Sequence, residues 1–196
     1  MRLFDLTHPL GPETPVFPGD EPVRLRASAA PANDGYRAAR LELGTHSGTH
    51  VDAPAHLFAE GPGLGDLPLD LWIGPALLLD ADALDGAPLS GVARLLLAGC
   101  PEGIPPDRAQ RLAGAGLRLV GVDGPSIDPL ASRELPSHRL LLGAGIAVVE
   151  NLRLEGVPRG AGTLYCLPLA IAAGDGAPAR VLWEPGEGAP GAAVGP

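Results

Sequence analysis

Three histidines and one aspartate fall within one short segment of this 196-residue chain. Residues 44–56 read G-T-H-S-G-T-H-V-D-A-P-A-H, so that His46, His50 and His56 occupy eleven residues with Asp52 between them. Imidazole nitrogens and carboxylate oxygens together suit zinc, manganese or iron. A single histidine is more often an ordinary surface or core residue, but clustered histidines that shared no metal would repel one another once protonated. The segment therefore predicts a metal site.

The spacing within this segment says less about its backbone. His46 and His50 are four residues apart, which on a helix would put both side chains on one face. Gly44, Gly48 and Pro54 argue against a long helix. We therefore expect a tight loop or a single helical turn that follows a strand.

Further ligands must come from elsewhere, because one short segment does not complete a site. The candidates are His138, which opens a Leu-rich segment, and Glu150, which ends the apolar run 146–149. A carboxylate at the end of a buried strand lies where α/β active sites collect. Glu150 also fits a solvated loop residue, and His138 also fits the first turn of a helix without a ligand role. The residues alone leave that choice open.

Short apolar runs bounded by Gly and Pro predict the elements that position these side chains. Such runs are typical of buried strands, and they cover residues 76–79, 92–98, 117–122, 146–149, 164–169 and 179–183. Two helical segments are expected at 107–115 and 138–142. A first strand within 1–7 precedes an ordered, proline-rich loop at 8–22. Strands joined by a mixture of helices and turns predict an α/β or α+β domain with a mixed sheet.

The length fits one domain, which we expect to span residues 1–183. The chain has 28 Gly and 23 Pro, and these two residue types make up seven of the 13 residues from 184 to 196. We expect residues 184–196 to form a C-terminal tail that is loosely ordered or packed on a partner.

Acidic residues outnumber basic ones by 23 to 14, and the formal net charge is −9. Such a surface repels phosphate backbones and anionic lipids, so we expect a small-molecule substrate and neither nucleic acid nor membrane partners. The N-terminal residues lack the apolar run of a signal peptide, and no apolar stretch reaches the roughly 18 residues of a membrane span. Cys100 and Cys166 show no C-x-x-C pattern; free thiols in a cytoplasmic protein are expected, with one disulfide as the alternative.

Several motifs in order resemble the cyclase family of metal-dependent hydrolases, which includes the bacterial kynurenine formamidases. H-S-G-T-H-V-D-A-P-A-H at 46–56 looks like that family's H-x-G-[TA]-H-x-D-x-P-x-H signature. Supporting motifs are T-P-V-F-P-G-D at 14–20, G-V-D-G-P-S-I-D-P at 121–129 and V-V-E-N-L at 148–152. The resemblance covers about residues 3–183. It implies a compact swivelling β/β/α domain, usually a homodimer or homotetramer whose partner subunit contributes to the wall of the site.

The resemblance also implies two divalent metal ions per subunit, zinc first and manganese as the alternative. The matching ligands are His46 and His50 for one metal, His138 for the other, and Asp52 and Glu150 as carboxylates that bridge both. These assignments weaken the ordinary roles considered above for His138 and Glu150.

The same resemblance implies an arylformamidase of tryptophan catabolism. A metal-bound hydroxide would attack the amide carbonyl of N-formylkynurenine, and His56, the match to the general acid/base, would protonate the leaving nitrogen. Phe17 stands where the formamidases generally carry a Trp that contacts the substrate, so an aromatic wall is kept and the indole N–H donor is lost. That departure leaves open a cyclic amide or lactone such as isatin as the substrate. A non-catalytic metal-binding module is a third hypothesis, which the retained His56 disfavours.

Overall fold

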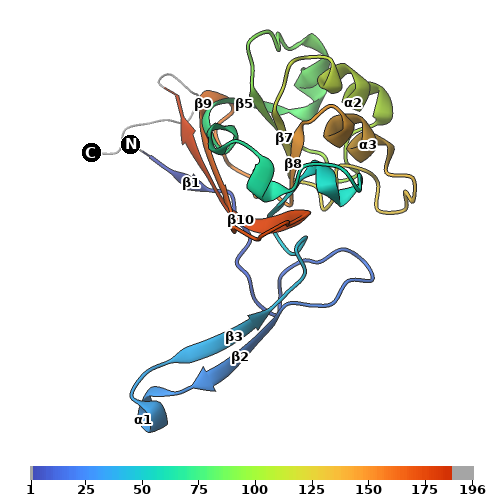
Figure 1. Cartoon of the computed structure of the whole chain (residues 1–196). Helices are drawn as coiled ribbons and strands as arrows, with labels where there is room; N and C mark the ends of the chain where they lie inside the picture. The colour runs from blue at the N-terminus through green and yellow to red at the C-terminus, as the bar shows by residue number, and fades with distance from the viewer. Residues whose placement is uncertain (1, 187–196) are drawn as a thin grey trace.

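The structure is a computed structural model that describes residues 2–186. One mixed sheet of eight strands forms its body (Figure 1). The strands are β1 (Phe4–Asp5), β4 (His50–Asp52), β5 (Ile73–Asp80), β6 (Arg94–Ala98), β7 (Leu119–Val122), β8 (Ala147–Glu150), β9 (Gly160–Pro168) and β10 (Gly176–Pro185). Their order is β1-β10-β4-β8-β7-β6-β5-β9, and β9 also pairs with β10, so the sheet closes on itself. Strands β5 to β8 are parallel to one another, and the other pairings are antiparallel. The predicted mixed α+β fold is confirmed.

The two faces of this sheet bury two separate apolar clusters. In β6, Leu95 and Leu97 belong to one cluster, whereas Leu96 between them belongs to the other, as the period of two in a strand requires. The cluster that contains Leu95 and Leu97 is covered by α2 (Pro106–Ala113) and α3 (Pro136–Gly143). These two helices lie side by side next to β7 and β8 (Figure 1). The closed sheet thereby gives the site a rigid wall.

Four short 3₁₀ turns connect these elements: η1 (Pro54–His56), η2 (Leu64–Asp66), η3 (Leu69–Leu71) and η4 (Ala81–Gly86). Each apolar run that predicted a strand overlaps one of β5 to β10, and both expected helices are present. In the range 2–186 no helix is long and apolar enough to cross a membrane. Both cysteines are buried and unpaired.

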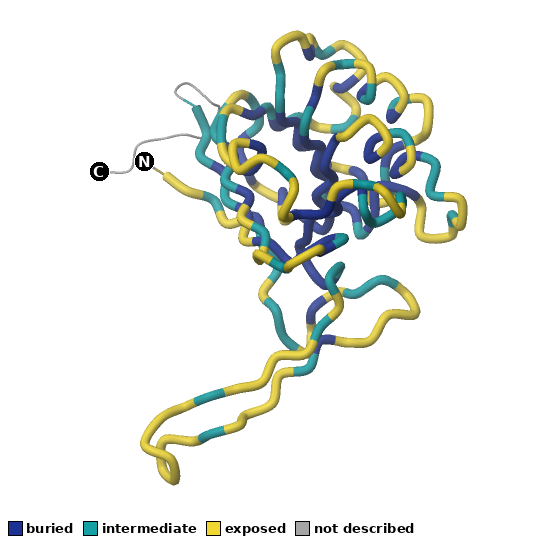
Figure 2. The backbone as a smooth tube through the Cα atoms, viewed as in Figure 1, coloured by how far each residue is buried: buried dark blue, intermediate teal, exposed yellow. Residues whose placement is uncertain are grey.

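A hairpin that the sequence did not reveal projects far from the body. It consists of β2 (Arg24–Ala29), the single-turn α1 (Pro31–Asp34) and β3 (Ala38–Glu42), and we call it the arm (Figure 1). Almost all of the arm is exposed (Figure 2). Its strands carry arginines and alanines in place of an apolar run, which explains why the apolar runs did not mark this hairpin.

Two boundaries differ from the sequence predictions. Residues 50–52 of the histidine-rich segment form strand β4, so the loop and helical turn that we expected there lie on either side of it. Strand β10 continues to Pro185, so that the expected tail begins later than residue 184. The remainder of that tail, residues 187–196, lies outside the described residues.

Candidate metal centre

Strand β4 lies between β10 and β8 and carries two of the candidate ligands. His50 and Asp52 are two residues apart on it, so both side chains point to the same face. Its antiparallel register with β8 places His50 directly opposite Glu150. The chain then enters η1, which ends at His56. Strand pairing therefore brings together residues that are about a hundred positions apart in the chain.

A buried aspartate, Asp128, positions His138 at the start of α3. Its carboxylate accepts the backbone N–H groups of Ser137 and His138 and lies 2.8 Å from the Nδ1 atom of the His138 ring. The opposite ring nitrogen, Nε2, is thereby directed to the strands, 3.3 Å from Asp52 Oδ2 and 3.0 Å from Glu150 Oε1. Asp128 lies in the motif at 121–129, but the sequence analysis predicted no role for it.

Four buried side chains form what we call the floor of the site: His50, Asp52, His138 and Glu150. As whole residues they are between 1% and 4% exposed. The Nε2 atom of His50 lies 3.3 Å from Asp52 Oδ1 and 3.3 Å from Glu150 Oε2. Among the buried side-chain nitrogen and oxygen atoms of residues 2–186, Asp52 Oδ2 is the one without a hydrogen bond.

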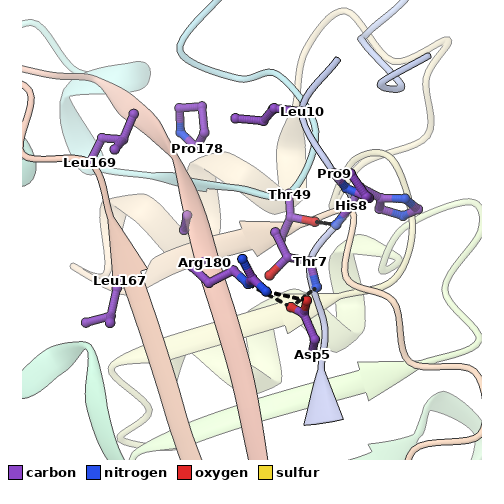
Figure 3. Close-up of a pocket in the computed structure, with 11 residues that line it drawn as sticks. Asp5, Thr7, His8, Pro9, Leu10, Thr49, Leu167, Leu169, Pro178 and Arg180 are labelled. Atoms are coloured by element: carbon purple, nitrogen blue, oxygen red, sulfur yellow. Dashed lines mark hydrogen bonds and ion pairs between the residues drawn. The ribbon is translucent and has the colours of Figure 1, made fainter. Parts of the chain in front are cut away.

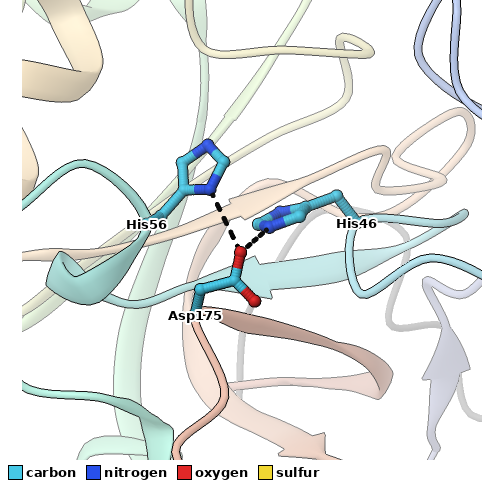
Figure 4. Close-up of side chains that lie close together, drawn as sticks. All are labelled: His46, His56 and Asp175. Carbon is cyan, nitrogen blue, oxygen red and sulfur yellow. Dashed lines mark hydrogen bonds and ion pairs between the residues drawn. The ribbon is translucent and has the colours of Figure 1, made fainter. Parts of the chain in front are cut away.

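Three half-buried side chains, His46, His56 and Asp175, form what we call the rim (Figure 4). His46 Nδ1 lies 2.7 Å from Asp52 Oδ1, and its Nε2 lies 2.8 Å from Asp175 Oδ2. The same Asp175 oxygen lies 3.5 Å from His56 Nδ1. Sequence analysis missed Asp175, whose only signal is its place between two glycines just before a predicted strand.

The proline-rich loop packs against the turn that precedes β4. The N–H of Gly48 donates to the carbonyl of Pro15, and a Cβ atom at Gly48 would lie 2.9 Å from the Thr14 side chain. Gly48 also has a φ of +65°, a conformation that suits glycine. This contact holds the loop beside the floor and brings Phe17 to the cavity.

The floor and the two rim histidines line one cavity of about 290 Å³, together with Phe17, Asp20, Pro125, Ser126, Leu135 and Asn151. The structure thus brings together all seven predicted site residues: Phe17, His46, His50, Asp52, His56, His138 and Glu150. His8 lies elsewhere, in a separate cavity of about 330 Å³ beside β1 and β10 (Figure 3). Its backbone N–H donates to the hydroxyl of Thr49 there.

Three of the four site histidines, His46, His50 and His138, have a raised pKa, and the fourth, His56, has a lowered one. Burial lowers the pKa of His46, but its hydrogen bond to Asp52 and the charge of that carboxylate outweigh burial. Burial lowers the pKa of His50, but the nearby Asp52 and Glu150 carboxylates outweigh it and raise the pKa to about 10. Burial likewise lowers the pKa of His138, but the Asp128, Asp52 and Glu150 carboxylates around its ring outweigh burial and raise the pKa to about 12. Burial and the neighbouring His46 and His138 lower the pKa of His56.

The carboxylates have the complementary response. Burial raises the pKa of Asp52, but His50, His138 and His46 outweigh burial and hold it well below its usual range. In Glu150, burial and the Asp52 charge raise the pKa, and the two floor histidines lower it overall. The floor is therefore a pair of buried anions that require positive charge beside them.

This donor set fits divalent cations. Potential ligand atoms of His46, His50 and Asp52 lie within 4.8 Å of one another, as do those of Asp52, His138 and Glu150. Asp52 belongs to both groups, and its Oδ2 atom is a buried acceptor without a hydrogen bond. A buried polar atom without a partner costs about 1–3 kcal/mol, and metal coordination would remove that cost.

Comparisons with known proteins agree with this geometry. The Cyclase family model matches residues 4–98. A curated kynurenine formamidase from Salinibacter ruber is 40% identical, over 93% of this chain and 97% of its own length. One from Geobacillus thermodenitrificans is 38% identical, over 90% and 94%. A solved structure described as a predicted metal-dependent hydrolase from Bacillus stearothermophilus is 27% identical with a TM-score of 0.80, over 93% of this chain and 97% of its own. An isatin hydrolase bound to thioisatinate has the same fold, with 22% identity and a TM-score of 0.80 over 92% and 91%.

Proposed function

This chain belongs to the cyclase family, and we propose that it is a kynurenine formamidase that hydrolyses N-formylkynurenine to kynurenine and formate. The observation that carries the proposal is the convergence of four side chains, His46, His50, His138 and Glu150, on Asp52, whose buried Oδ2 atom accepts no hydrogen bond, with His56 beside them in the same cavity. Relatives of that name at 35–40% identity over nearly the whole chain support it.

We assign two divalent cations to the site, zinc first and manganese as the alternative. The first cation would be held by His46, His50 and Asp52, and the second by His138, with Asp52 and Glu150 shared. When bound, such cations supply Lewis-acid polarisation of a carbonyl and lower the pKa of a coordinated water toward about 7.

His56 supplies the proton transfer. Hydrolysis forms a bond between a water oxygen and the formyl carbon and breaks the bond between that carbon and the aromatic amine nitrogen. The nitrogen must leave with a proton, which His56 takes from the water and delivers to it. The pKa of His56 is lowered by burial and by His46 and His138, which suits an imidazole that begins the reaction neutral.

Phe17 provides an aromatic wall for the substrate. Phe17 lines the same cavity as the floor and the two rim histidines. Its ring offers stacking without the N–H donor of an indole. The substrate is an aryl formamide, so a ring face at this position fits it. The amide hydrogen bond that a Trp would supply is the part of substrate recognition in which this chain differs.

The decisive experiment measures formate release from N-formylkynurenine by the purified protein. We expect activity that a chelator abolishes and that added Zn²⁺ or Mn²⁺ restores. The Asp82→Asn variant, which changes an exposed aspartate outside the site, serves as a control and should retain activity. Activity indifferent to the chelator would overturn the metal assignment.

A second candidate substrate is a cyclic amide such as isatin, favoured by the Phe17 side chain in place of an indole donor. The same preparations should be assayed for ring opening of isatin. Turnover of isatin with no release of formate would replace the formamidase assignment by this one. Bound metal with no turnover of either substrate would favour a non-catalytic metal-binding module.

We also propose that the protein is a homodimer, or a homotetramer built from such dimers, in which the arm of one copy docks on the body of another. An isolated two-stranded hairpin is at best marginally stable in water. The arm nevertheless exposes Leu25 (52%) and Leu41 (45%), which are directly paired across its strands. Residues 24–42 carry four arginines against one Asp and one Glu, a net charge of +2, within a chain of net charge −9. A basic, partly apolar arm and an acidic body are complementary.

Light scattering on the double variant Leu25→Ser, Leu41→Ser tests this arrangement. We expect the native protein to be a dimer or a larger even assembly and the variant to be a monomer. Leu69→Ser is the matched control, because Leu69 is 84% exposed but lies on the body. An assembly that persists in the arm variant, or a monomeric native protein, would contradict the proposal.

A further inference from the structure

We propose that Asp175 is a positioning residue that holds the metal ligand His46 and the acid/base His56 in a fixed relation through one carboxylate oxygen. The inference rests on the proposed function and extends it to a residue outside the motifs that carry the family resemblance. It acts through two other side chains, so Asp175 itself need not touch the substrate.

The geometry around a single oxygen atom carries the argument. Asp175 Oδ2 lies 2.8 Å from His46 Nε2 and 3.5 Å from His56 Nδ1 (Figure 4). The two imidazole rings lie against each other, with centroids 4.2 Å apart and planes inclined by 46°. One acceptor thus faces one nitrogen of each ring.

A carboxylate in this position selects the tautomer of each ring, because an anionic oxygen accepts a proton and does not donate one. His46 then carries its proton on Nε2, and in the metal-loaded protein proposed above its Nδ1 lone pair would be available to the cation that it shares with Asp52, whose Oδ1 atom lies 2.7 Å away. His56 carries its proton on Nδ1 and leaves Nε2 free to take and deliver the transferred proton. A carboxylate behind a ligating histidine is the usual way in which proteins fix such a ring.

The backbone around Asp175 is built to hold this carboxylate in place. The carbonyl of Asp175 accepts the N–H of Ala53 at 2.8 Å, and the carbonyl of Gly174 accepts the N–H of Leu64 at 2.9 Å. Ala53 joins strand β4 to η1, the turn that carries His56, so the loop is tied to the segment that it orients. On the other side, a Cβ atom at Gly176 would lie 2.6 Å from Cε1 of His46. The loop therefore packs directly on the ring.

The test compares three substitutions at Asp175 on the zinc-loaded full-length protein. Asp175→Asn keeps the shape and removes the charge, Asp175→Ala removes the acceptor, and Asp175→Glu keeps the charge on a longer side chain. With N-formylkynurenine we expect kcat to fall by about 10–100-fold in the Asp175→Asn and Asp175→Ala variants. We expect their KM to stay within about twofold of the native value and two metals to remain bound. Glu should recover part of the loss, and Asp82→Asn should behave as the native protein.

A second readout is independent of activity. Nitrogen-15 NMR of the histidine rings distinguishes the two tautomers, and we expect His56 to be protonated on Nδ1 in the native protein and to lose that preference in Asp175→Ala. If the native protein does not hydrolyse N-formylkynurenine, the proposed function fails, but this spectrum still tests the role of Asp175. The proposal would be overturned by a native kcat in both Asp175→Asn and Asp175→Ala, or by an unchanged His56 tautomer in Asp175→Ala. It would also be overturned by loss of one bound metal in Asp175→Asn, because Asp175 would then be a ligand.

Discussion

The floor and the rim use the same two residue types in different surroundings. The floor side chains are between 1% and 6% exposed and stand on paired strands and on α3. In the rim the exposed fraction of the side chains rises from 19% for His46 to 42% for Asp175, and these residues stand on turns and short loops. In spite of burial, the neighbouring carboxylates raise the pKa of both floor histidines and of His46 at the rim, whereas the pKa of His56 is lowered.

This difference separates two chemical tasks. Buried carboxylates require positive charge beside them, and rigid strands hold them at fixed separations. A proton carrier must reach substrate and solvent, so a half-exposed position suits it. We therefore interpret the floor as the part that binds metal and the rim as the part that transfers protons, with His46 joining the two.

The largest effect is expected from Asp52→Asn in the floor. In the proposed two-metal site, this substitution would remove a ligand from both cations, and the polarisation that they would supply is worth several kcal/mol. We expect kcat/KM to fall by more than about ten-thousandfold, with bound metal well below two per chain by elemental analysis. A variant with two metals and substantial activity would show that Asp52 does not bridge.

The next effect is expected from His56→Ala at the rim, and it should be of a different kind. General acid–base catalysis contributes about 100- to 10,000-fold, so we expect kcat to fall by about a thousandfold with the metal content unchanged. Steady-state kinetics and elemental analysis on the same sample check this. Loss of metal in this variant would break the division between floor and rim.

Asp128→Asn should have an intermediate effect that belongs to the floor. Asp128 accepts three hydrogen bonds from Ser137 and His138 and directs the His138 ring. Substitutions behind a ligating histidine cost about 10–100-fold in metal affinity or activity. We expect weaker binding of one metal in a chelator titration, whereas the analogous Asp175→Asn should keep both metals. Equal metal loss in the two variants would remove the contrast.

The smallest effect is expected from Phe17→Trp on the cavity wall. An added indole N–H contributes about one hydrogen bond, on the order of 1 kcal/mol. We expect KM for N-formylkynurenine to fall by a few fold with little change in kcat, and no gain for isatin. A gain for isatin instead would assign the aromatic wall to the other substrate.

Much of the fold was predictable because buried strands leave a direct trace in the sequence. Each apolar run bounded by Gly and Pro marks a strand, since the strands of a largely covered sheet must be apolar on both faces. The arm left no such trace, because its residues are selected for an exposed position. Strand β4 was obscured as well, since two of its three residues are candidate ligands.

The sequence by itself determined the chemistry of the site: the residue types, the spacing of His46, His50, Asp52 and His56, and the family resemblance that favoured a ligand role for the candidates His138 and Glu150. The tertiary structure decided which groups meet. The β4–β8 register sets His50 opposite Glu150, and closure of the sheet by β10 brings Asp175 to two histidines more than a hundred residues away. Such contacts depend on strand register and on loops anchored by backbone hydrogen bonds, and local sequence patterns encode neither.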